Sequence, residues 1–248
     1  MKDVLRSEWI KLRTVRVNFV LCIIAAAFPL IVVALVAALT SDKKQSADDL
    51  VGLVTGTMIV TALLLGVVGA LNLTSEYSHN TIRTSFAAVP QRRRVLFAKG
   101  LISVVVFALY AAVIEIACYL LGSTILDGRG ASVVLTGPKK AAMLGLVVLV
   151  AMLVLLGFSL GMIIRNSPAT ITTFILWPLL LESIARGVLS AAGVHNPTPW
   201  LPYQSAFTMA NPNPDSSDPG RVRAGLFLGV VLLAFVVIGT LVNERRDA

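Results

Sequence analysis

The sequence has few residues of the kinds that bind metals or form disulfides. Its 248 residues include only two cysteines and two histidines, and none of them has the spacing of a metal site. Cys22 and Cys118 fall at opposite depths of two apolar stretches, which makes an intrachain disulfide geometrically unfavourable. We therefore expect no metal site, and we interpret both cysteines as small apolar residues.

A phosphate-binding loop is also missing. The pattern G-x-x-x-x-G-K-[ST] cradles the phosphates of ATP in many ATPases. The only partial match, Gly137-Pro138-Lys139, lacks the upstream glycine and the following Ser or Thr. The chain is therefore not expected to bind ATP by that route, and the sequence suggests no catalytic residue and no cofactor of its own.

Charge is nearly absent from six long stretches, whereas 56% of the residues are hydrophobic and the mean hydropathy is +0.85. A charge-poor apolar run of about 18 residues or more is long enough to cross a bilayer as a helix. We predict an all-α membrane protein that forms a single transmembrane domain over residues 1–248. The predicted spans are 17–39, 50–73, 98–122, 141–164, 168–189 and 222–243.

The cations predict the orientation. With the N-terminus placed in the cytoplasm, the cytoplasmic segments hold the whole excess of positive charge, +8 for the chain. Anionic lipid of the inner leaflet accounts for such a surface. A nucleic-acid partner would also suit a pI of 9.9, but every basic run is flanked by an apolar span. We expect membrane lipids and no nucleic acid as partners, with both termini cytoplasmic.

Residues 1–16 have the pattern of an amphipathic helix lying on the inner membrane surface. Leu5, Trp9 and Leu12 recur at helical spacing, and Lys2 and Arg6 lie toward another side. Trp9 is a suitable interfacial anchor. The alternative is a solvated cytoplasmic tail, which would not need the tryptophan.

The cytoplasmic connection 74–97 is the longest and the most basic. A solvated loop carrying the positive-inside signal would explain Arg92–Arg94. It would not explain the compact polar cluster that begins at Glu76. A short helix parallel to the membrane, docking on a cytoplasmic partner, explains both.

This connection resembles that of the permease subunits of ABC-2 type transporters. In that family a Glu-x-x-x-Gly-Thr stretch follows the second span, and a Pro, an Arg and a Lys lead into the third. The matching residues here are Glu76, Asn80-Thr81, Pro90, Arg92-Arg93 and Lys99. Asn80 replaces the usual Gly and is the next-best residue for a left-handed turn. The opening segment Ser7–Thr14 is similar to the surface elbow helix of bacterial members.

The resemblance implies a non-enzymatic permease in a bacterial plasma membrane that exports a hydrophobic or amphipathic substrate. It implies two partners: a second permease, identical or paralogous, and a cognate ATPase subunit that holds ATP and Mg. The implied coupling residues, which would contact the ATPase, are Glu76, Tyr77, Ser78, His79, Asn80, Thr81 and Arg83.

The outer connection 190–221 holds six of the eleven prolines and remains apolar, with Trp200, Tyr203 and Phe207. We predict two short helices that dip back into the outer leaflet, and the resemblance implies that they form an outer gate. An ordinary loop with interfacial aromatic residues is the alternative.

Three charges lie inside predicted spans: Glu115, Glu182 and Arg186. Glu182 and Arg186 have the spacing of a helical ion pair, and Glu115 could share Arg186. These residues either line the transport path or form a structural pair. A different function, proton-coupled secondary transport or a channel, would use Glu115 or Glu182 as the proton acceptor.

Smaller signals concern helix shape. Pro29 and Pro178 should each kink a span, and Ser167 could cap the fifth. Three G-x-x-x-G pairs, at 52/56, 157/161 and 225/229, permit close helix approach, although 18 glycines produce one or two such pairs by chance.

Overall fold

The computed structural model of the chain describes residues 15–41, 43–78, 92–213 and 220–246. The regular elements in these ranges are all helical, and six of the helices are long and apolar enough to cross a membrane. Their bounds are Arg16–Leu39, Ala47–Ser78, Arg93–Gly128, Gly137–Ile164, Ser167–Ala191 and Arg221–Asn243. The prediction of an all-α fold with six spans is confirmed. The predicted interfacial helix, with Trp9, lies almost wholly outside the described residues.

Several helices extend well beyond the predicted apolar spans. Helix α3 covers Lys43–Ser78 and α5 covers Arg92–Gly128, so each is about 55 Å long against a hydrocarbon core of about 30 Å. The segment expected as a first outer loop, 42–49, is helical from Lys43. It contains neither Gly nor Pro, the two residues that most disfavour a helix, so the helix can continue past the end of the apolar run.

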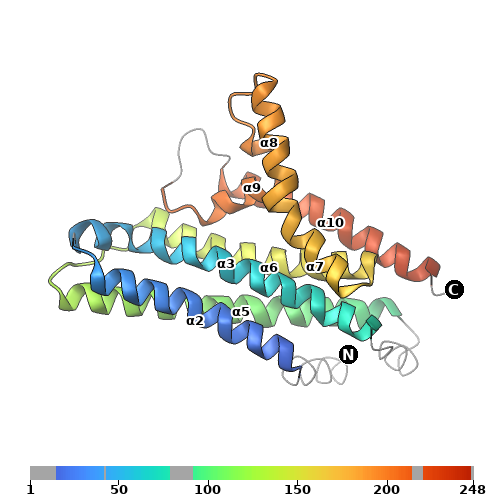
Figure 1. Ribbon diagram of the computed structural model, residues 1–248, viewed down its shortest axis with the longest axis horizontal. Coiled ribbons are helices and arrows are strands. Elements are labelled where there is room, and N and C mark those ends of the chain that lie inside the picture. The colour runs from blue at the N-terminus through green and yellow to red at the C-terminus, as the bar shows by residue number, and fades with distance from the viewer. Residues whose placement is uncertain (1–14, 42, 79–91, 214–219, 247–248) are drawn as a thin grey trace.

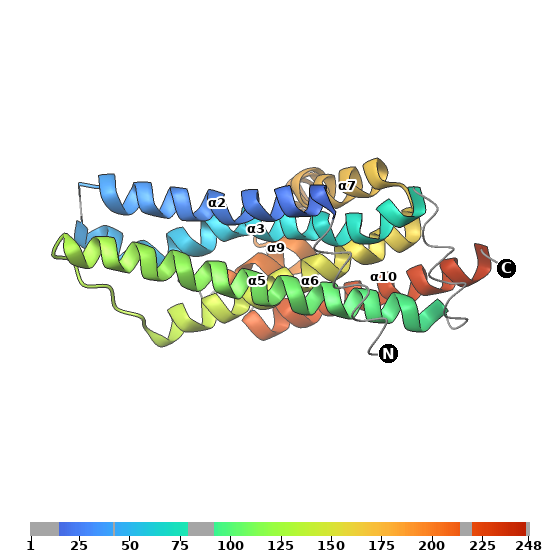
Figure 2. The same cartoon turned by 90° about the horizontal axis from the view of Figure 1, so that it is seen from below.

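Four helices lie side by side along the long axis of the molecule: α2 (Arg16–Leu39), α3, α5 and α6 (Gly137–Ile164) (Figures 1 and 2). Helix α10 (Arg221–Arg246) packs against α6. Helix α3 ends, α5 begins, and α6 and α10 end at the same end of the bundle, which we call the Glu76 end (Figures 1 and 2).

The fifth span is broken into three parts and leaves the bundle at a steep angle (Figure 1). It consists of α7 (Ser167–Leu176), a π-helical turn η1 (Trp177–Leu181) and α8 (Glu182–Ala191). The following segment forms three short helices: η2 (Thr198–Trp200), α9 (Pro202–Phe207) and η3 (Thr208–Ala210). Helices α9 and η3 pack against α6 and α10.

Helices α3 and α6 form the core of the bundle. In their apolar windows 56% and 61% of the residues are buried, against 17% in α2 and α10. The two backbones touch because Gly69 and Gly157 have no side chains. A Cβ atom at Gly157 would overlap with the carbonyl oxygen of Gly66, and one at Gly69 with that of Val154. Of the three glycine pairs seen in the sequence, 157/161 therefore lies at a close helix contact, whereas Gly56 faces open space.

The start of α7 differs from the prediction. Asn166, not Ser167, is the N-cap, and its side-chain oxygen accepts a hydrogen bond from the Ala169 amide at 3.0 Å. Ser167 is the first helical residue and donates its hydroxyl to Thr74 Oγ1 on α3 at 2.9 Å. Pro168 falls in the first turn, where its missing N–H costs nothing.

Pro29 leaves one backbone acceptor of α2 without its helical donor. A proline at this position cannot donate to the carbonyl of Ala25, four residues earlier. The hydroxyl of Thr61, on α3, donates to that oxygen instead at 2.6 Å, and both Ala25 and Thr61 are fully buried. In lipid an unsatisfied carbonyl would be costly, so this bond fixes α2 against α3 at the proline.

Replacing Thr61 by Val should lower the free energy of unfolding by about 1 kcal/mol, because the Ala25 carbonyl loses its donor. Thr57→Val is the matched control, since the Thr57 hydroxyl bonds only carbonyls of its own helix, those of Leu53 and Val54. Thermal unfolding in detergent measures both variants. Equal melting temperatures for the two would contradict the assigned role of Thr61.

Candidate functional site

A buried ion pair joins α3 and α5 at the Glu76 end. Lys99 Nζ lies 2.9 Å from Glu76 Oε1, and the Lys99 side chain is only 1% exposed. One turn deeper, Asn72 Nδ2 donates to Ser103 Oγ, and that hydroxyl donates to the Lys99 carbonyl at 2.8 Å. Because the helices run antiparallel, the i, i+4 positions of one meet those of the other. The two rungs form a polar ladder in an otherwise apolar contact.

A second polar cluster joins α3, α6 and α10 at the same end. It consists of Tyr77, Arg165 and Asn243, and we call it the end cluster. The Tyr77 hydroxyl and Arg165 Nη2 both donate to Asn243 Oδ1, the latter at 2.8 Å. The Arg165 guanidinium also lies 4.9 Å from the centroid of the Tyr77 ring. The amide of Asn243 in turn donates to the Met162 carbonyl at 3.2 Å.

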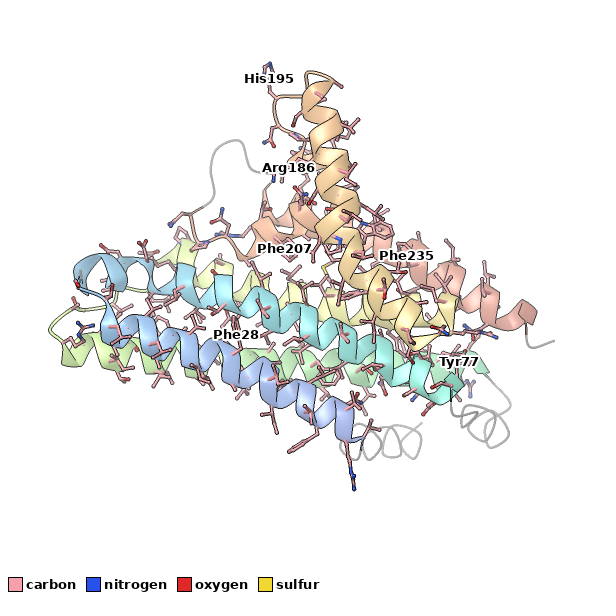
Figure 3. All side chains as sticks on the ribbon, in the orientation of Figure 1. Phe28, Tyr77, Arg186, His195, Phe207 and Phe235 are labelled. Atoms are coloured by element: carbon pink, nitrogen blue, oxygen red, sulfur yellow. The ribbon has the colours of Figure 1, made fainter. Side chains whose placement is uncertain are left out.

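The backbone at Arg165 is shaped to reach this cluster. Arg165 ends α6 in the left-handed conformation, with φ 57°, which is a position that usually favours glycine. This conformation costs free energy in a non-glycine residue. The hydrogen bond to Asn243 and the contact with Tyr77 offset that cost. Figure 3 shows Tyr77 at this end of the bundle, far from η1 and α8, which we call the projecting arm and which carry Arg186.

The predicted coupling residues divide into two groups. Glu76, Tyr77 and Ser78 form the last turn of α3, where Glu76 and Tyr77 face the bundle and Ser78 is exposed. His79, Asn80, Thr81 and Arg83 lie outside the described residues. The segment 79–91 therefore leaves from α3 and returns to α5 at helix ends that the ion pair holds together.

Sequence reasoning missed part of this end. Glu76 and Lys99 were both identified in the motif, but not as partners, and Asn243 and the role of Arg165 were not anticipated. The available signal was the repetition of polar residues four apart in two antiparallel helices, Asn72/Glu76 and Lys99/Ser103. Nothing comparable marks Asn243, which is a single polar residue at the end of an apolar run.

A second polar site lies where the fifth span changes direction. Pro178 cannot donate to the Phe174 carbonyl, and the helix widens into the π-helical turn η1 at that position. Tyr203, on α9, directs its hydroxyl at the Phe174 oxygen at 3.5 Å. The kink predicted at Pro178 is thus a π-helical turn. Tyr203 covers it from the segment formed by η2, α9 and η3, which we call the hairpin.

Glu182 connects that turn to the hairpin. Its carboxylate accepts hydrogen bonds from the backbone amides of Tyr203 and Gln204, both at 2.9 Å, and from Trp177 Nε1 at 3.1 Å. The two amides belong to the first turn of α9, where the helix lacks its own acceptors and its dipole favours an anion. Glu182 is 3% exposed, so a carboxylate buried in the membrane segment caps the hairpin helix.

The predicted pairing of Glu182 with Arg186 is not formed. Arg186 Nη2 instead donates to Thr198 Oγ1, at 3.4 Å. The physical reason is that three N–H donors converge on the Glu182 carboxylate from η1 and α9, whereas Arg186, one turn further along α8, is exposed. The partners of Glu182 are therefore set by tertiary contacts and not by the spacing of residues within the helix.

Glu115 stands apart from both polar sites. It is 2% exposed, on α5, and its Oε1 accepts no hydrogen bond from the described residues. The predicted sharing of Arg186 by Glu115 is not seen, since no ion pair joins the two residues within the described ranges.

The three predicted gate aromatics differ in their surroundings. Tyr203 is buried and stacks edge-on with Phe174, with ring centroids 6.2 Å apart, and lies 6.3 Å from the Phe207 ring. Trp200 is 68% exposed. Tyr203 and Phe207 are therefore packed into the hairpin contact, whereas Trp200 faces outward. No group of three or more His, Cys, Asp or Glu residues able to hold a metal occurs in the described part of the chain.

Comparison with known proteins matches most of the chain to a family model. The profile described as ABC-2 family transporter protein matches residues 4–192, which include the first five spans and the whole segment between α3 and α5. Helices α9 and α10 follow the matched region. A search of curated proteins finds no match.

Replacing Lys99 by Met should lower the free energy of unfolding by about 3 kcal/mol, because Glu76 is left as an uncompensated buried charge. Adding Glu76→Leu to that variant should recover most of the loss. Arg94→Met, which removes an exposed cation from the same helix, is the control and should change little. Thermal unfolding of the detergent-solubilised protein measures all three, and a single variant as stable as the control would contradict the role of the pair.

Replacing Glu182 by Gln should raise hydrogen exchange at the Tyr203 and Gln204 amides about tenfold, because a charged acceptor is replaced by a neutral one. Arg186→Met should leave both amides unchanged. Exchange measured by mass spectrometry on peptides covering α9 distinguishes the two. A rise in the Arg186 variant alone would instead indicate that the helical pair stabilises the hairpin.

Proposed function

Because the chain belongs to the ABC-2 family of transporter membrane proteins, we propose that it is the permease subunit of an ATP-driven exporter, forming half of the translocation pathway. The observation that carries the proposal is the Glu76 end. Five helices are joined there by buried and partly buried polar contacts, next to the segment that the family motif marks. A permease subunit that is moved by a separate ATPase needs such a rigid connection where the two subunits meet.

We propose that this end faces the cytoplasm of a bacterium, with both termini on the same side. The cation excess of the sequence supports this orientation, because Lys and Arg near the ends of spans concentrate on the cytoplasmic side. The even number of spans is consistent with it.

A separate ATPase subunit, holding ATP and Mg, would grip the segment that begins in the last turn of α3. Its direct contacts would be Ser78, His79, Asn80, Thr81 and Arg83, and Glu76 and Tyr77, which face the bundle, would transmit the contact inward. The buried pair would then carry a push on this segment into α3 and α5 together, because separating Lys99 from Glu76 would expose two charges to an apolar environment. The end cluster would extend that movement to α6 and α10.

The hinge of the proposed mechanism is the π-helical turn. It lacks the regular hydrogen-bond ladder, and a break of this kind lets a helix bend. Glu182 ties the turn to α9, so bending of the fifth span would move Tyr203 and Phe207 with it. We assign Trp200, Tyr203 and Phe207 to the outer gate on this basis.

The projecting arm is the observation that supports our proposal of a second permease subunit as partner. Side chains on several sides of η1 and α8 are both apolar and exposed, including Leu179 at 62%, Ile184 at 56% and Val188 at 63%. A helix that leaves its own bundle at a steep angle is stabilised little by packing against its own chain. An identical or paralogous permease packing against α8 would cover this surface and close the pathway between the two halves.

Glu115 is the observation that favours a second candidate, proton-coupled transport. Its carboxylate is buried and Oε1 has no partner within the described residues, as expected of a proton acceptor. Glu182 does not suit this role, because its carboxylate is already engaged by three N–H donors. Transport into liposomes driven by a pH gradient without any ATPase, and lost in Glu115→Gln, would support this candidate over the exporter.

Thr81→Trp should lower substrate-stimulated ATP hydrolysis by the complex with its ATPase subunit about tenfold, a typical size for coupling between sites. Thr124→Trp is the matched control, because Thr124 is exposed near the opposite end of α5. Co-purification of the two subunits and their hydrolysis rate are the measurements. Unchanged stimulation in the Thr81 variant would remove this segment from the ATPase contact.

A further inference from the structure

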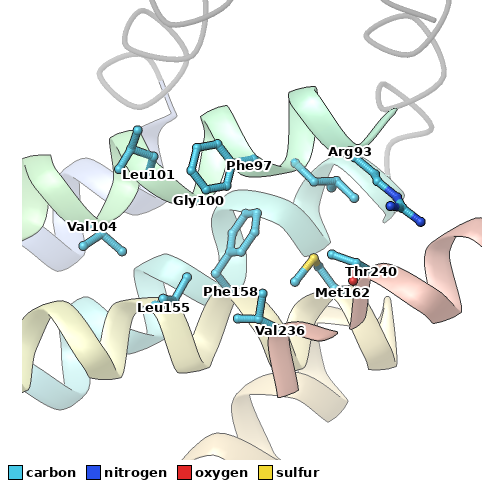
Figure 4. Close-up of a pocket in the computed structure, with 11 residues that line it drawn as sticks. Arg93, Phe97, Gly100, Leu101, Val104, Leu155, Phe158, Met162, Val236 and Thr240 are labelled. Carbon is cyan, nitrogen blue, oxygen red and sulfur yellow. The ribbon is translucent and has the colours of Figure 1, made fainter. Parts of the chain in front are cut away.

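A narrow apolar groove runs along the outside of the bundle between α5, α6 and α10 (Figure 4). Its volume is about 220 Å³. Phe97, Leu101 and Val104 line it from α5, Phe158 from α6 and Val236 from α10. None of the residues assigned above to coupling, to the gate or to the pathway lines this groove.

The sequence makes the groove by placing a glycine at its floor. Gly100 has no side chain, and a Cβ atom there would stand 3.2 Å from Phe158 Cε1. The ring of Phe158 therefore lies directly against the α5 backbone. The longer side chains on either side of it form the walls of the groove. Phe97 forms one lip and is 65% exposed, so the groove opens to the surroundings of the bundle.

The groove has a charged end and a length that matches one leaflet. Arg93 lines it at the Glu76 end and is exposed, and its guanidinium points away from the apolar floor (Figure 4). From Arg93 to Val104 the helix rises about 16 Å, roughly half of a hydrocarbon core of about 30 Å. Apart from Arg93 and the Thr240 hydroxyl, the lining side chains are apolar.

We propose that this groove binds one anionic phospholipid of the inner leaflet, with its phosphate at Arg93 and an acyl chain along Gly100 and Phe158. Arg suits the phosphate because its fork of N–H donors matches phosphate oxygens. The volume of about 220 Å³ argues against a helix of a second chain, because a helix about 10 Å across occupies far more space over the same length. The proposal rests on the cytoplasmic orientation given above but not on the ATPase contact.

The test is native mass spectrometry of the protein released from micelles that contain equal amounts of phosphatidylglycerol and phosphatidylcholine. The wild-type protein should retain one phosphatidylglycerol in preference to phosphatidylcholine. Arg93→Gln should lower that retention at least fivefold, whereas Arg94→Gln, an exposed neighbour that does not line the groove, should retain lipid as the wild type does.

Filling the groove tests the acyl-chain site. Val236→Trp should abolish retention, and Val230→Trp, at an exposed position of the same helix outside the groove, should not. Leu101→Trp replaces the first variant if its melting temperature falls. Equal retention by Arg93→Gln and Arg94→Gln, or full retention by both groove-filled variants, would overturn the proposal. So would efficient disulfide cross-linking of Phe97→Cys between two copies, which would make this face a protein interface.

These outcomes are independent of the proposed function. Lipid retention is measured without ATP or the ATPase subunit, and Arg93 and Val236 are not among the coupling residues. Loss of coupling in the Thr81 variant with normal lipid retention would leave this proposal standing, and the reverse result would leave the exporter standing.

Discussion

The buried pair of Lys99 and Glu76 is the interaction on which the account depends. Two charges in an apolar helix contact are stable only together, so α3 and α5 cannot separate at this end without a large cost. The segment between the two helices is the one marked by the family motif. The pair therefore makes the two flanking helix ends one mechanical unit, and the end cluster of Tyr77, Arg165 and Asn243 connects that unit to α6 and α10.

The same requirement for satisfied polar groups organises the rest of the bundle. Pro29 and Pro178, which lie beyond the first turn of their spans, each remove a donor, and in both cases a hydroxyl from another helix is directed at the freed carbonyl: Thr61 at Ala25 and Tyr203 at Phe174. Pro29 leaves α2 as one helix, whereas Pro178 accompanies a π-helical turn. The difference places stiffness in the first span and a bend in the fifth, where Glu182 connects the bend to the hairpin.

The sequence predicted what depends on composition over long windows and missed what depends on one partner. Six apolar helices follow from charge-poor runs, and the irregular turn at Pro178 follows from its missing donor, whereas α2 continues as one helix through Pro29. The pairing of Glu182 was predicted wrongly because spacing within a helix says nothing about the α9 amides. Asn166, not Ser167, caps the fifth span. Either residue type can cap a helix, and only the hydrogen bond of Ser167 to Thr74 on α3 distinguishes them. The G-x-x-x-G pattern marked Gly157 but not Gly69, because the contact arises from two helices jointly and the pattern describes only one of them.

The most direct test of the account is whether nucleotide at the ATPase moves the permease through the buried pair. Spin labels at Ser78 on α3 and Val188 on α8, with Cys22 and Cys118 replaced, report the distance between the coupling end and the projecting arm. The account predicts a nucleotide-dependent change in that distance, its loss in Lys99→Met while hydrolysis continues, and its return when Glu76→Lys is combined with Lys99→Glu. An undiminished distance change in the folded Lys99→Met complex would contradict it.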